Sequence, residues 1–327
     1  MEINAAADHG INVFIFDWYW YDGLPFLEGH LNDGYLKARN NDRVKFYLMW
    51  ANHDVNLAWD KRNADDAFNG KNNDLIWRGD IDRREFEKIA LRWIRKYFSH
   101  PSYYKIDGKP VLMIYDLKKL VQGLGGIEQA KDAIDMLERK TKQAGFPGVH
   151  LNVMSWMLNN KFLQQVRGVS RPKDLQAFLD GLNCGSASTY CYLHHNEYSE
   201  KDGFPSAPIQ TLFASMEKYW NSIIKEFPGV LYTPNISMGW DASPRCMQTD
   251  KFEYRRYPWT PVFTGNTPTE FQRQLTKAKE FLDIYKPREK IVVINSWNEW
   301  TEGSYLLPEK KYGDAYLKAI KAVFGNN

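Results

Sequence analysis

The stretch Ile291-Val-Val-Ile-Asn-Ser-Trp-Asn-Glu-Trp-Thr-Glu-Gly303 combines a short apolar run with a polar and aromatic continuation. Four consecutive branched apolar residues predict a strand that is covered on both faces, as the strands of parallel sheets are. The carboxylates Glu299 and Glu302 follow within eight residues of that run. In parallel α/β barrels the functional side chains follow the carboxyl ends of the strands. The stretch therefore predicts both a fold class and a candidate site.

The same alternation of apolar run and helical pattern continues along the rest of the chain. We predict strands at Ile11–Phe16, Val44–Trp50, Pro110–Tyr115, Val149–Met154, Ala187–Cys191, Val230–Ile236 and Ile291–Asn295. We predict helices at Pro25–Arg39, Arg83–Phe98, Ile127–Ala144, Leu175–Leu182, Pro208–Glu226, Pro268–Tyr285 and Tyr312–Phe324. Such repetition implies parallel strands joined by right-handed crossovers. A doubly wound sheet also fits, but no glycine-rich nucleotide motif follows the first strand.

The number of predicted strands is one short of eight. The chain opens on Glu2–His9, which is typical of the end of a helix that leads into the first predicted strand. We therefore expect an α/β fold, a (β/α)8 TIM-type barrel that lacks its first strand, in a single catalytic domain over residues 1–327. If upstream residues were removed, any export signal went with them, and loss of such a signal would favour a periplasmic or secreted location. The compartment is otherwise unknown.

Bulk composition excludes several classes of protein. The chain has 327 residues, of which 43% are hydrophobic and 25% charged, and a net charge of +3, which gives no reason to expect nucleic acid as a partner. Three cysteines without metal-ligand spacing predict neither a disulfide framework nor a metal site, and no apolar run is long enough to span a membrane. The 12 Trp and 19 Tyr exceed what a core requires and indicate a ring-lined cleft suited to sugars. The oligomeric state is not indicated.

Polar and aromatic side chains gather just after most of the predicted strands. We predict ligand contacts from Asp17, Trp18, Tyr19, Trp20, Trp50, Asn52, His53, Tyr190, His194, Trp240, Asp241, Arg245, Asn295, Trp297 and Trp300. For the four aromatic residues Trp18–Tyr21 the alternative is packing of the rings beneath the barrel top, and for Asp241 and Arg245 it is an ion pair that fixes their loop. His53 and Asp54 are adjacent and point apart on an extended chain, so they do not predict a metal site.

Glu299 and Glu302 are the strongest candidate pair. Cleavage of a glycosidic bond needs one protonated carboxyl to assist the leaving oxygen and a second to act as base or nucleophile. On a helical turn, residues three apart have Cβ atoms about 5–6 Å apart, close to the carboxyl separation of about 5–5.5 Å in retaining enzymes. Burial beside Trp297 and Trp300 would raise the pKa of one carboxyl. The alternative is that one glutamate binds loop amides and the other is solvated.

Segments along nearly the whole chain are similar to one known family. Trp297-Asn-Glu-Trp-Thr-Glu-Gly303 resembles the signature of the glycoside hydrolase family 99-like domain. Further similar segments occur in the family's order, at Asp8–Gly10 with Tyr19-Trp20, at Trp50–Asn52, at Gly239–Arg245 and at Tyr305–Gly313. The resemblance implies retaining cleavage within α-mannoside chains, without metal or cofactor. It also implies that Glu299 acts as base on the sugar's 2-hydroxyl and Glu302 as general acid and then base.

The chain departs from the family after Trp50–Asn52, where His53-Asp54-Val55 stands in place of the usual Glu-Asn-Trp. This loop bears on the choice of sugar. Many members of the wider family are labelled glycosyltransferases of polysaccharide assembly. We predict a retaining hydrolase of O-glycosyl bonds in a glycan or polysaccharide, with an endo-acting α-mannosidase as its specific form. The alternatives are a glycosyltransferase of surface polysaccharide biosynthesis and a non-catalytic carbohydrate-binding barrel.

Overall fold

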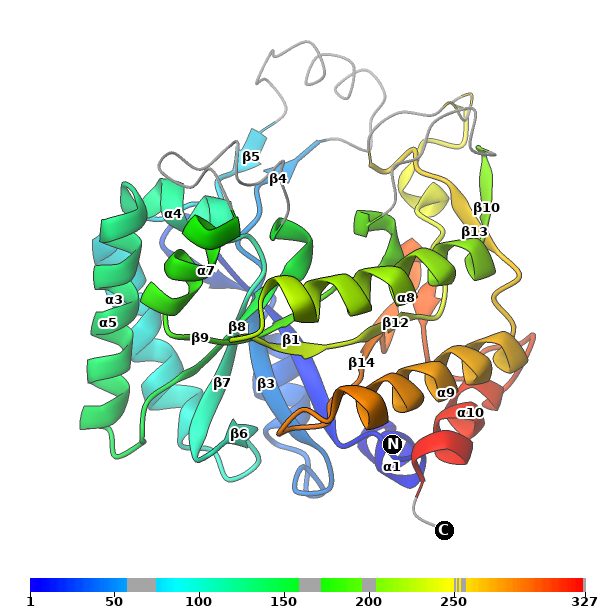
Figure 1. Cartoon of the computed structure of the whole chain (residues 1–327), viewed down its shortest axis with the longest axis horizontal. Coiled ribbons are helices and arrows are strands. Elements are labelled where there is room, and N and C mark those ends of the chain that lie inside the picture. The colour runs from blue at the N-terminus through cyan, green and yellow to red at the C-terminus, as the bar shows by residue number, and fades with distance from the viewer. Residues whose placement is uncertain are drawn as a thin grey trace.

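The computed structural model describes residues 1–57, 75–158, 172–195, 204–249, 251, 253 and 257–325. It is an α/β fold in which helices surround a central, mainly parallel sheet (Figure 1). The main path of the sheet runs β11-β9-β8-β7-β3-β1-β2. Its strands are β1 (Val13–Tyr21), β2 (Leu24–Phe26), β3 (Lys45–Trp50), β7 (Lys109–Ile114), β8 (His150–Met154), β9 (Cys184–Ser188) and β11 (Leu231–Thr233). Among the described residues, only β2, on β1, and β6 (Lys105–Ile106), on β7, pair antiparallel with this sheet.

The last predicted strand, β14 (Val293–Asn295), joins this order through β12 (Asn235–Ser237). Pro234 separates β11 from β12, and since proline has no amide hydrogen it interrupts the single strand predicted there. The first half pairs with β9 and the second with β14, both in parallel. The parallel strands therefore follow one another as in a TIM-type barrel. No backbone pairing between β14 and β1 closes that barrel in the part of the chain that the structure describes.

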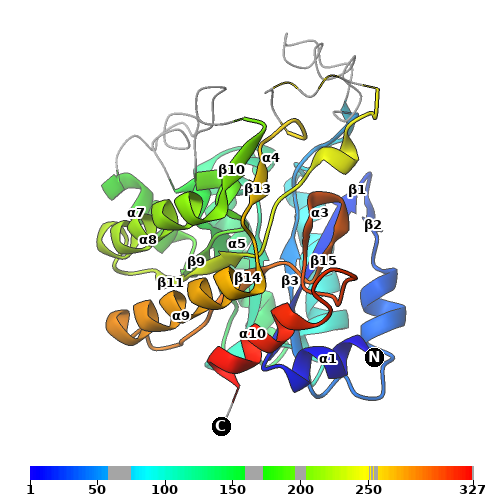
Figure 2. The same cartoon turned by 90° about the vertical axis from the view of Figure 1, so that its right-hand side faces the viewer.

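The longer helices cover the outside of the sheet (Figures 1 and 2). They are α1 (Glu2–Asp8), α3 (Arg83–Trp93), α4 (Leu117–Leu124), α5 (Ile127–Gln143), α7 (Pro172–Gly181), α8 (Ile209–Glu226), α9 (Pro268–Tyr285) and α10 (Ala315–Phe324). Asp82, Asp116 and Thr267 cap three of them by accepting a hydrogen bond from a first-turn amide. Short ribbons pair β4 (Val55–Asn56) with β5 (Leu75–Trp77), β10 (Ser206–Pro208) with β13 (Val262–Thr264), and β15 (Asn298–Glu299) with β16 (Ser304–Tyr305).

Two predicted elements were wrong in position or type. The helix expected at Pro25–Arg39 is replaced by β2 and a short π-helix at His30–Tyr35. The cause is Asp22-Gly23, whose positive φ angles of 50° and 74° make the hairpin turn that Asp-Gly favours. The strand expected at Ala187–Cys191 begins earlier, at Cys184.

A buried carboxylate, Glu28, ties the π-helix to the helix layer. Its side chain is only 9% exposed and accepts hydrogen bonds from Trp18 Nε1 at 2.7 Å, Tyr97 Oη at 2.8 Å and Arg92 Nε at 2.9 Å. Burial alone would raise the pKa of Glu28, but the bonds from Arg92, Trp18 and Tyr97 outweigh it and bring that pKa to about 2. The carboxylate therefore stays charged and anchors β1 to α3.

We expect Glu28→Ala to lower the free energy of unfolding by about 3 kcal/mol or more, because it leaves the Arg92 guanidinium without its partner in a partly buried site. The matched control is Glu87→Ala, whose carboxylate is 45% exposed and lies 4.0 Å from Arg83. Loss of the Glu87 carboxylate should lower the free energy of unfolding by less than about 0.5 kcal/mol. Urea denaturation measures both, and equal losses in the two variants would contradict the assignment.

Candidate active site

The two candidate carboxylates lie on a tight hairpin that follows β14. Glu299 ends β15, and the residues from Trp300 to Glu302 form one turn of 3₁₀ helix before β16. Gly303 closes the turn with a φ of 61°, and a Cβ there would lie 2.7 Å from the Cβ of Asp241. The Asp241 amide donates to the Glu302 carbonyl at 2.6 Å. Backbone contacts thus fix the hairpin against the loop that carries Asp241.

One guanidinium holds both carboxylates. Arg245 Nη2 lies 2.8 Å from Glu299 Oε1, and Arg245 Nη1 lies 3.3 Å from Glu302 Oε1. Arg245 Nε also donates to Thr301 Oγ1 at 2.8 Å, and that hydroxyl donates to Glu299 Oε1 at 3.1 Å. The alternative of an Asp241–Arg245 ion pair is wrong, since Asp241 instead accepts from the amide of Ser243. Arg245 therefore fixes the relative positions of the two glutamates.

Tyr257 adds a second contact to Glu302 that was not predicted from the sequence. Its hydroxyl donates to Glu302 Oε1 at 2.7 Å and accepts a hydrogen bond from Arg245 Nη1. No motif surrounds Tyr257 in the sequence. Its only signal is a position twelve residues beyond Arg245, in a segment for which no strand or helix was predicted.

The two glutamates differ in their surroundings. The Glu302 side chain is 8% exposed, whereas that of Glu299 is 30% exposed. Burial raises the pKa of Glu302 above its usual range, although Arg245 and Tyr257 act in the opposite direction. Glu302 Oε2 is buried and has no hydrogen-bond partner among the described residues. That atom is free to hold a proton and to meet a bound group.

A third carboxyl group faces these two from the neighbouring wall. Asp17 is on β1 and lines a cavity of about 570 Å³ together with Tyr190 and Asn295. Burial, then the charges of Glu299 and Glu302, raise the pKa of Asp17 to about 7. The hydroxyl of Tyr19, 3.4 Å from Asp17 Oδ2, opposes this shift only in part.

Aromatic rings form a continuous wall beside Asp17. Tyr19 contacts His53, His53 contacts Tyr115, and Tyr115 contacts Tyr190, with ring centroids 5.6–6.0 Å apart. His194 joins at 5.9 Å from Tyr190 and stacks on Trp156 at 4.3 Å. Burial lowers the pKa of His194 to about 4, so the ring is neutral at pH 7. Five of the residues predicted as ligand contacts thus lie near one another, namely Asp17, Tyr19, His53, Tyr190 and His194.

Other predicted ligand contacts lie elsewhere. Trp18, Trp20 and Trp50 are buried, and both Trp18 and Trp50 contact Trp93 of α3, because alternate side chains of a strand point to opposite faces. The prediction that these three rings contact a ligand is therefore wrong, and packing in the core is correct. Asn52 is also occupied, since its amide group exchanges two hydrogen bonds of 2.8 Å with the backbone of Asp116.

The remaining tryptophans and Asn295 have distinct positions. Trp240 is buried and donates to Thr260 at 2.9 Å, so it supports the loop and does not reach a ligand. Trp297 packs on Phe14, and its Nε1 donates to Glu2 and not to Glu299 or Glu302. Trp300 is 47% exposed and lies against Tyr305. Asn295 accepts from Ser304 at 2.7 Å, while its Nδ2 faces the cavity wall without a partner among the described residues.

The described residues contain no group of three or more His, Cys, Asp or Glu side chains that could hold a metal ion. None of their helices is both long and apolar enough to cross a membrane.

Comparison with known proteins shows the family to which the chain belongs. The sequence model of the family described as Glycosyltransferase WbsX matches residues 1–320, and the chain belongs to that family. Its relatives include the uncharacterized protein WxcX of Xanthomonas campestris, in two strains, at 21% identity over 329 residues. That match covers 98% of this chain, which spans 40% of the length of the curated relatives.

Solved structures confirm the expected resemblance to family 99. A glycoside hydrolase-like protein superposes with a TM-score of 0.63 at 18% identity, covering 99% of this chain and 84% of the other. The GH99 endo-alpha-mannosidase from Bacteroides thetaiotaomicron superposes with a TM-score of 0.56 at 14% identity, covering 98% and 76%. At these identities the likeness concerns the fold.

We expect Asp17→Asn to stabilise the protein more at pH 8 than at pH 5. The pKa of the Asp17 carboxyl is about 7 in the folded protein and about 3.9 in the unfolded chain. Stability therefore falls as pH rises from about 4 to about 7, and the asparagine variant lacks this loss. Thermal melts at both pH values measure it, with the exposed Asp135→Asn as control. If the Asp17→Asn variant were more stable than the wild type by the same amount at pH 5 and pH 8, Asp17 would be ionised at both pH values.

Proposed function

We propose that the chain is a retaining glycoside hydrolase that cleaves within a glycan or polysaccharide, on a (β/α)8-type barrel that lacks its first strand. The observation that carries the proposal is the cluster in which Arg245 bridges Glu299 and Glu302 while Tyr257 donates to Glu302. Retaining cleavage requires two carboxyl groups at a fixed short separation and in different protonation states. A bridging guanidinium supports the first condition, and the greater burial of Glu302 favours the second.

Glu302 has the properties of the general acid. It is the more buried carboxyl, its pKa is raised, and Oε2 has no partner among the described residues. A protonated Oε2 delivers its proton to the leaving glycosidic oxygen, and the resulting carboxylate then activates water. Arg245 and Tyr257 stabilise the negative charge that forms on Oε1.

Glu299 has the properties of the base at the sugar. It is more exposed than Glu302, and Arg245 and Thr301 both contact Oε1, which leaves Oε2 to approach the substrate. By resemblance to family 99, it removes the proton of the sugar's 2-hydroxyl, and that oxygen closes on the anomeric carbon. Water activated by Glu302 later opens the three-membered ring, so the two inversions give net retention.

The substrate that fits best is an α-mannoside chain. The supporting facts are the fold shared with an endo-alpha-mannosidase and the wall of rings from Tyr19 to His194, on which pyranose faces can pack. Asp17, as a neutral carboxyl below pH 7, can donate a hydrogen bond to a sugar oxygen. Asn295 Nδ2 offers another buried donor on the same cavity wall.

A glycosyltransferase is the second candidate, since the family's description names that activity. A nucleotide sugar bound through a divalent cation needs free carboxylates. The sequence has one Asp-x-Asp segment, Asp80-Ile-Asp82, and Asp82 is occupied as the cap of α3. Because Asp82 already accepts this capping hydrogen bond, it is less available to a cation, which favours the hydrolase.

We expect Glu302→Gln and Glu299→Gln each to lower the release of reducing ends from α-mannan by about 10²–10⁴-fold, because each removes one proton-transfer group. Both variants should keep the wild-type circular dichroism spectrum. The control Glu280→Gln alters an exposed residue of α9 and should keep full activity. Unchanged turnover in Glu302→Gln would contradict the assignment.

The transferase alternative predicts a different result. Isothermal calorimetry with GDP-mannose and Mg²⁺ should give no heat of binding if the chain is a hydrolase. Micromolar binding, together with no release of reducing ends from any α-mannan, would mean that the chain is a transferase and not a hydrolase.

A further inference from the structure

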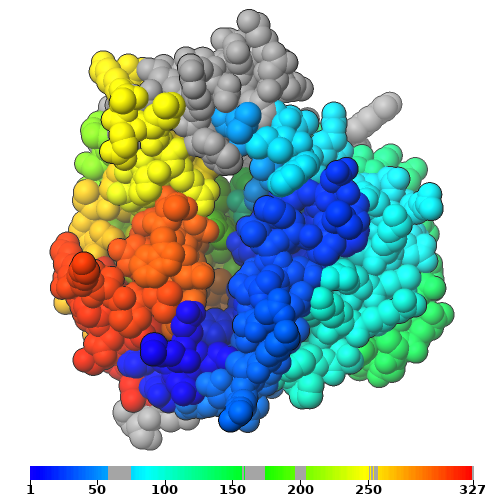
Figure 3. All heavy atoms as spheres, turned by 180° about the vertical axis from the view of Figure 1, so that it is seen from behind, coloured from blue at the N-terminus to red at the C-terminus, as the bar shows by residue number. Residues whose placement is uncertain are grey.

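Exposed apolar side chains gather on two neighbouring ribbons, the β1–β2 hairpin and the β4–β5 ribbon. They are 37–67% exposed and comprise Leu24, Phe26, Leu27, Leu57 and Ile76. Elsewhere in the described part of the chain, such exposure of a large apolar side chain is limited to Met1, Met247, Ile284 and Trp300. The blue N-terminal segments and the cyan segments lie together beside the hollow that separates them from the orange C-terminal segments (Figure 3). Apolar groups that gather in this way, and are not scattered singly, mark a binding surface.

Aromatic rings connect these two ribbons with the candidate active site. The rings of Phe26 and Trp77 have centroids 5.3 Å apart, and the buried Tyr21 stacks on Trp77 at 5.6 Å. Tyr19 contacts Phe26 at 6.4 Å and Tyr21 at 6.1 Å. Tyr19 and Tyr21 share with Asp17 one face of β1, because side chains alternate along a strand. Phe26 and Trp77, which we call the ledge, therefore extend the wall of rings outward from Tyr19.

Polar contacts beneath the ledge fix it in place. The hydroxyl of Tyr21 donates to the carbonyl of His53 at 3.0 Å. The amide of Gly79, just after β5, donates to Asp54 Oδ1 at 2.9 Å. A Cβ on Gly79 would lie 2.4 Å from the carbonyl carbon of His53, so the ribbon packs closely on the loop that carries His53. The rings are thus positioned before a ligand arrives, which reduces the entropy lost on binding.

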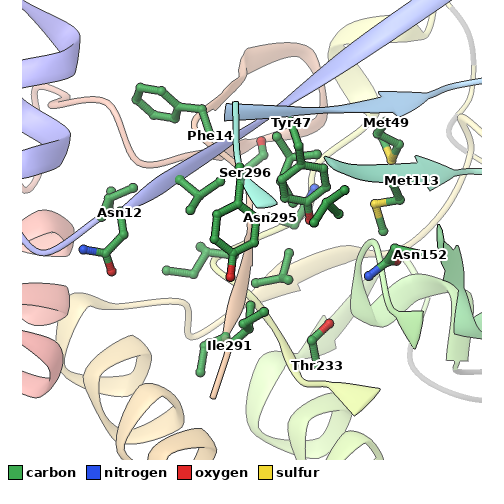
Figure 4. A pocket seen from close by; sticks show the side chains of 18 of the residues that line it. Asn12, Phe14, Tyr47, Met49, Met113, Asn152, Thr233, Ile291, Asn295 and Ser296 are labelled. Carbon is green, nitrogen blue, oxygen red and sulfur yellow. The ribbon is translucent and has the colours of Figure 1, made fainter. Parts of the chain in front are cut away.

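The cavity next to the candidate site is less suited to a sugar chain than the ledge is. Met49, Met113 and Ile291 line this cavity, and its wall is mainly apolar (Figure 4). Hydroxyl groups enclosed there would lose the hydrogen bonds that they make with water. On the ledge a sugar can pack one apolar face on an aromatic ring while its hydroxyls stay in water. This contrast favours an outward path for a chain bound at the two glutamates.

We propose that the ledge of Phe26 and Trp77 binds sugars of the glycan chain that lie beyond the bond to be cleaved, so that long chains are preferred to short ones. The inference rests on the proposed function and deepens it. The exposed, charged Asp22 and Arg78 directly follow Tyr21 and Trp77 in the chain. Charged groups can hydrogen-bond sugar hydroxyls in water, but they are depleted from the cores of protein interfaces, where they would be desolvated. A carbohydrate therefore fits this surface better than a second copy of the chain or a lipid layer.

The test measures chain-length preference in variants of the full chain. We expect Trp77→Ala and Phe26→Ala each to lower the ratio of kcat/KM on α-mannan to kcat/KM on a chromogenic α-mannobioside by at least about five-fold. The reason is that only the polymer reaches the ledge. Trp77→Phe keeps a ring and should retain most of the ratio. The control Ile284→Ala alters an exposed apolar residue of α9 and should leave the ratio unchanged.

A binding measurement separates failure of this inference from failure of the proposed hydrolase. In the Glu302→Gln background, affinity electrophoresis in α-mannan should show weaker binding when Trp77→Ala is added. Such weakening in a protein whose wild type has no turnover would support the ledge and contradict the hydrolase. Turnover with an unchanged ratio in both alanine variants would overturn the ledge and leave the hydrolase.

Other occupants of the ledge predict different losses. Self-association detected by light scattering, or binding to phosphatidylglycerol vesicles, would be lost in Trp77→Ala and Phe26→Ala while the α-mannan ratio stayed constant. Either result would assign the ledge to a second copy of the chain or to lipid, and would overturn the proposal. Wild-type protein that neither binds nor cleaves α-mannan would contradict both the ledge and the hydrolase.

Discussion

The candidate site depends on one interaction, the bridge from the Arg245 guanidinium to Glu299 and Glu302. Two carboxylates at this range repel each other, and without a shared cation the hairpin would be driven to separate them. The planar guanidinium offers donors in a fixed geometry, so it also sets the angle between the two groups. Gly303 and the amide of Asp241 hold the two loops close enough for this bridge to form.

Around that bridge, burial assigns different tasks to similar groups. Glu302 and Asp17 have raised pKa values because they are withdrawn from water near other negative charges. Glu299 is more exposed and tied to Arg245 and Thr301. In the proposed mechanism Asp17 binds the sugar as a neutral carboxyl, Glu302 delivers the proton and Glu299 acts as the base.

The sequence was sufficient for the succession of parallel strands and for locating the candidate pair of glutamates, because apolar runs and the Glu299–Glu302 spacing are local signals. It was insufficient for side-chain direction. Trp18, Trp20 and Trp50 follow or end predicted strands, yet the alternation of the strand turns them into the core. Tyr257 was missed because its role arises only from folding, and the Asp22-Gly23 hairpin was missed because the apolar pattern after it resembles a helix. The strand count of one short of eight is in keeping with the lack of backbone pairing between β14 and β1 among the described residues.

The order of events at the anomeric carbon tests the central claim most directly. Proton NMR can follow the first minutes of α-mannan digestion, before the released sugar mutarotates. Two carboxyl groups held by Arg245 at short range predict that the new reducing end appears first as the α-anomer. First appearance of the β-anomer would mean a single inversion with water between more distant groups, and would contradict the roles given to Glu299 and Glu302.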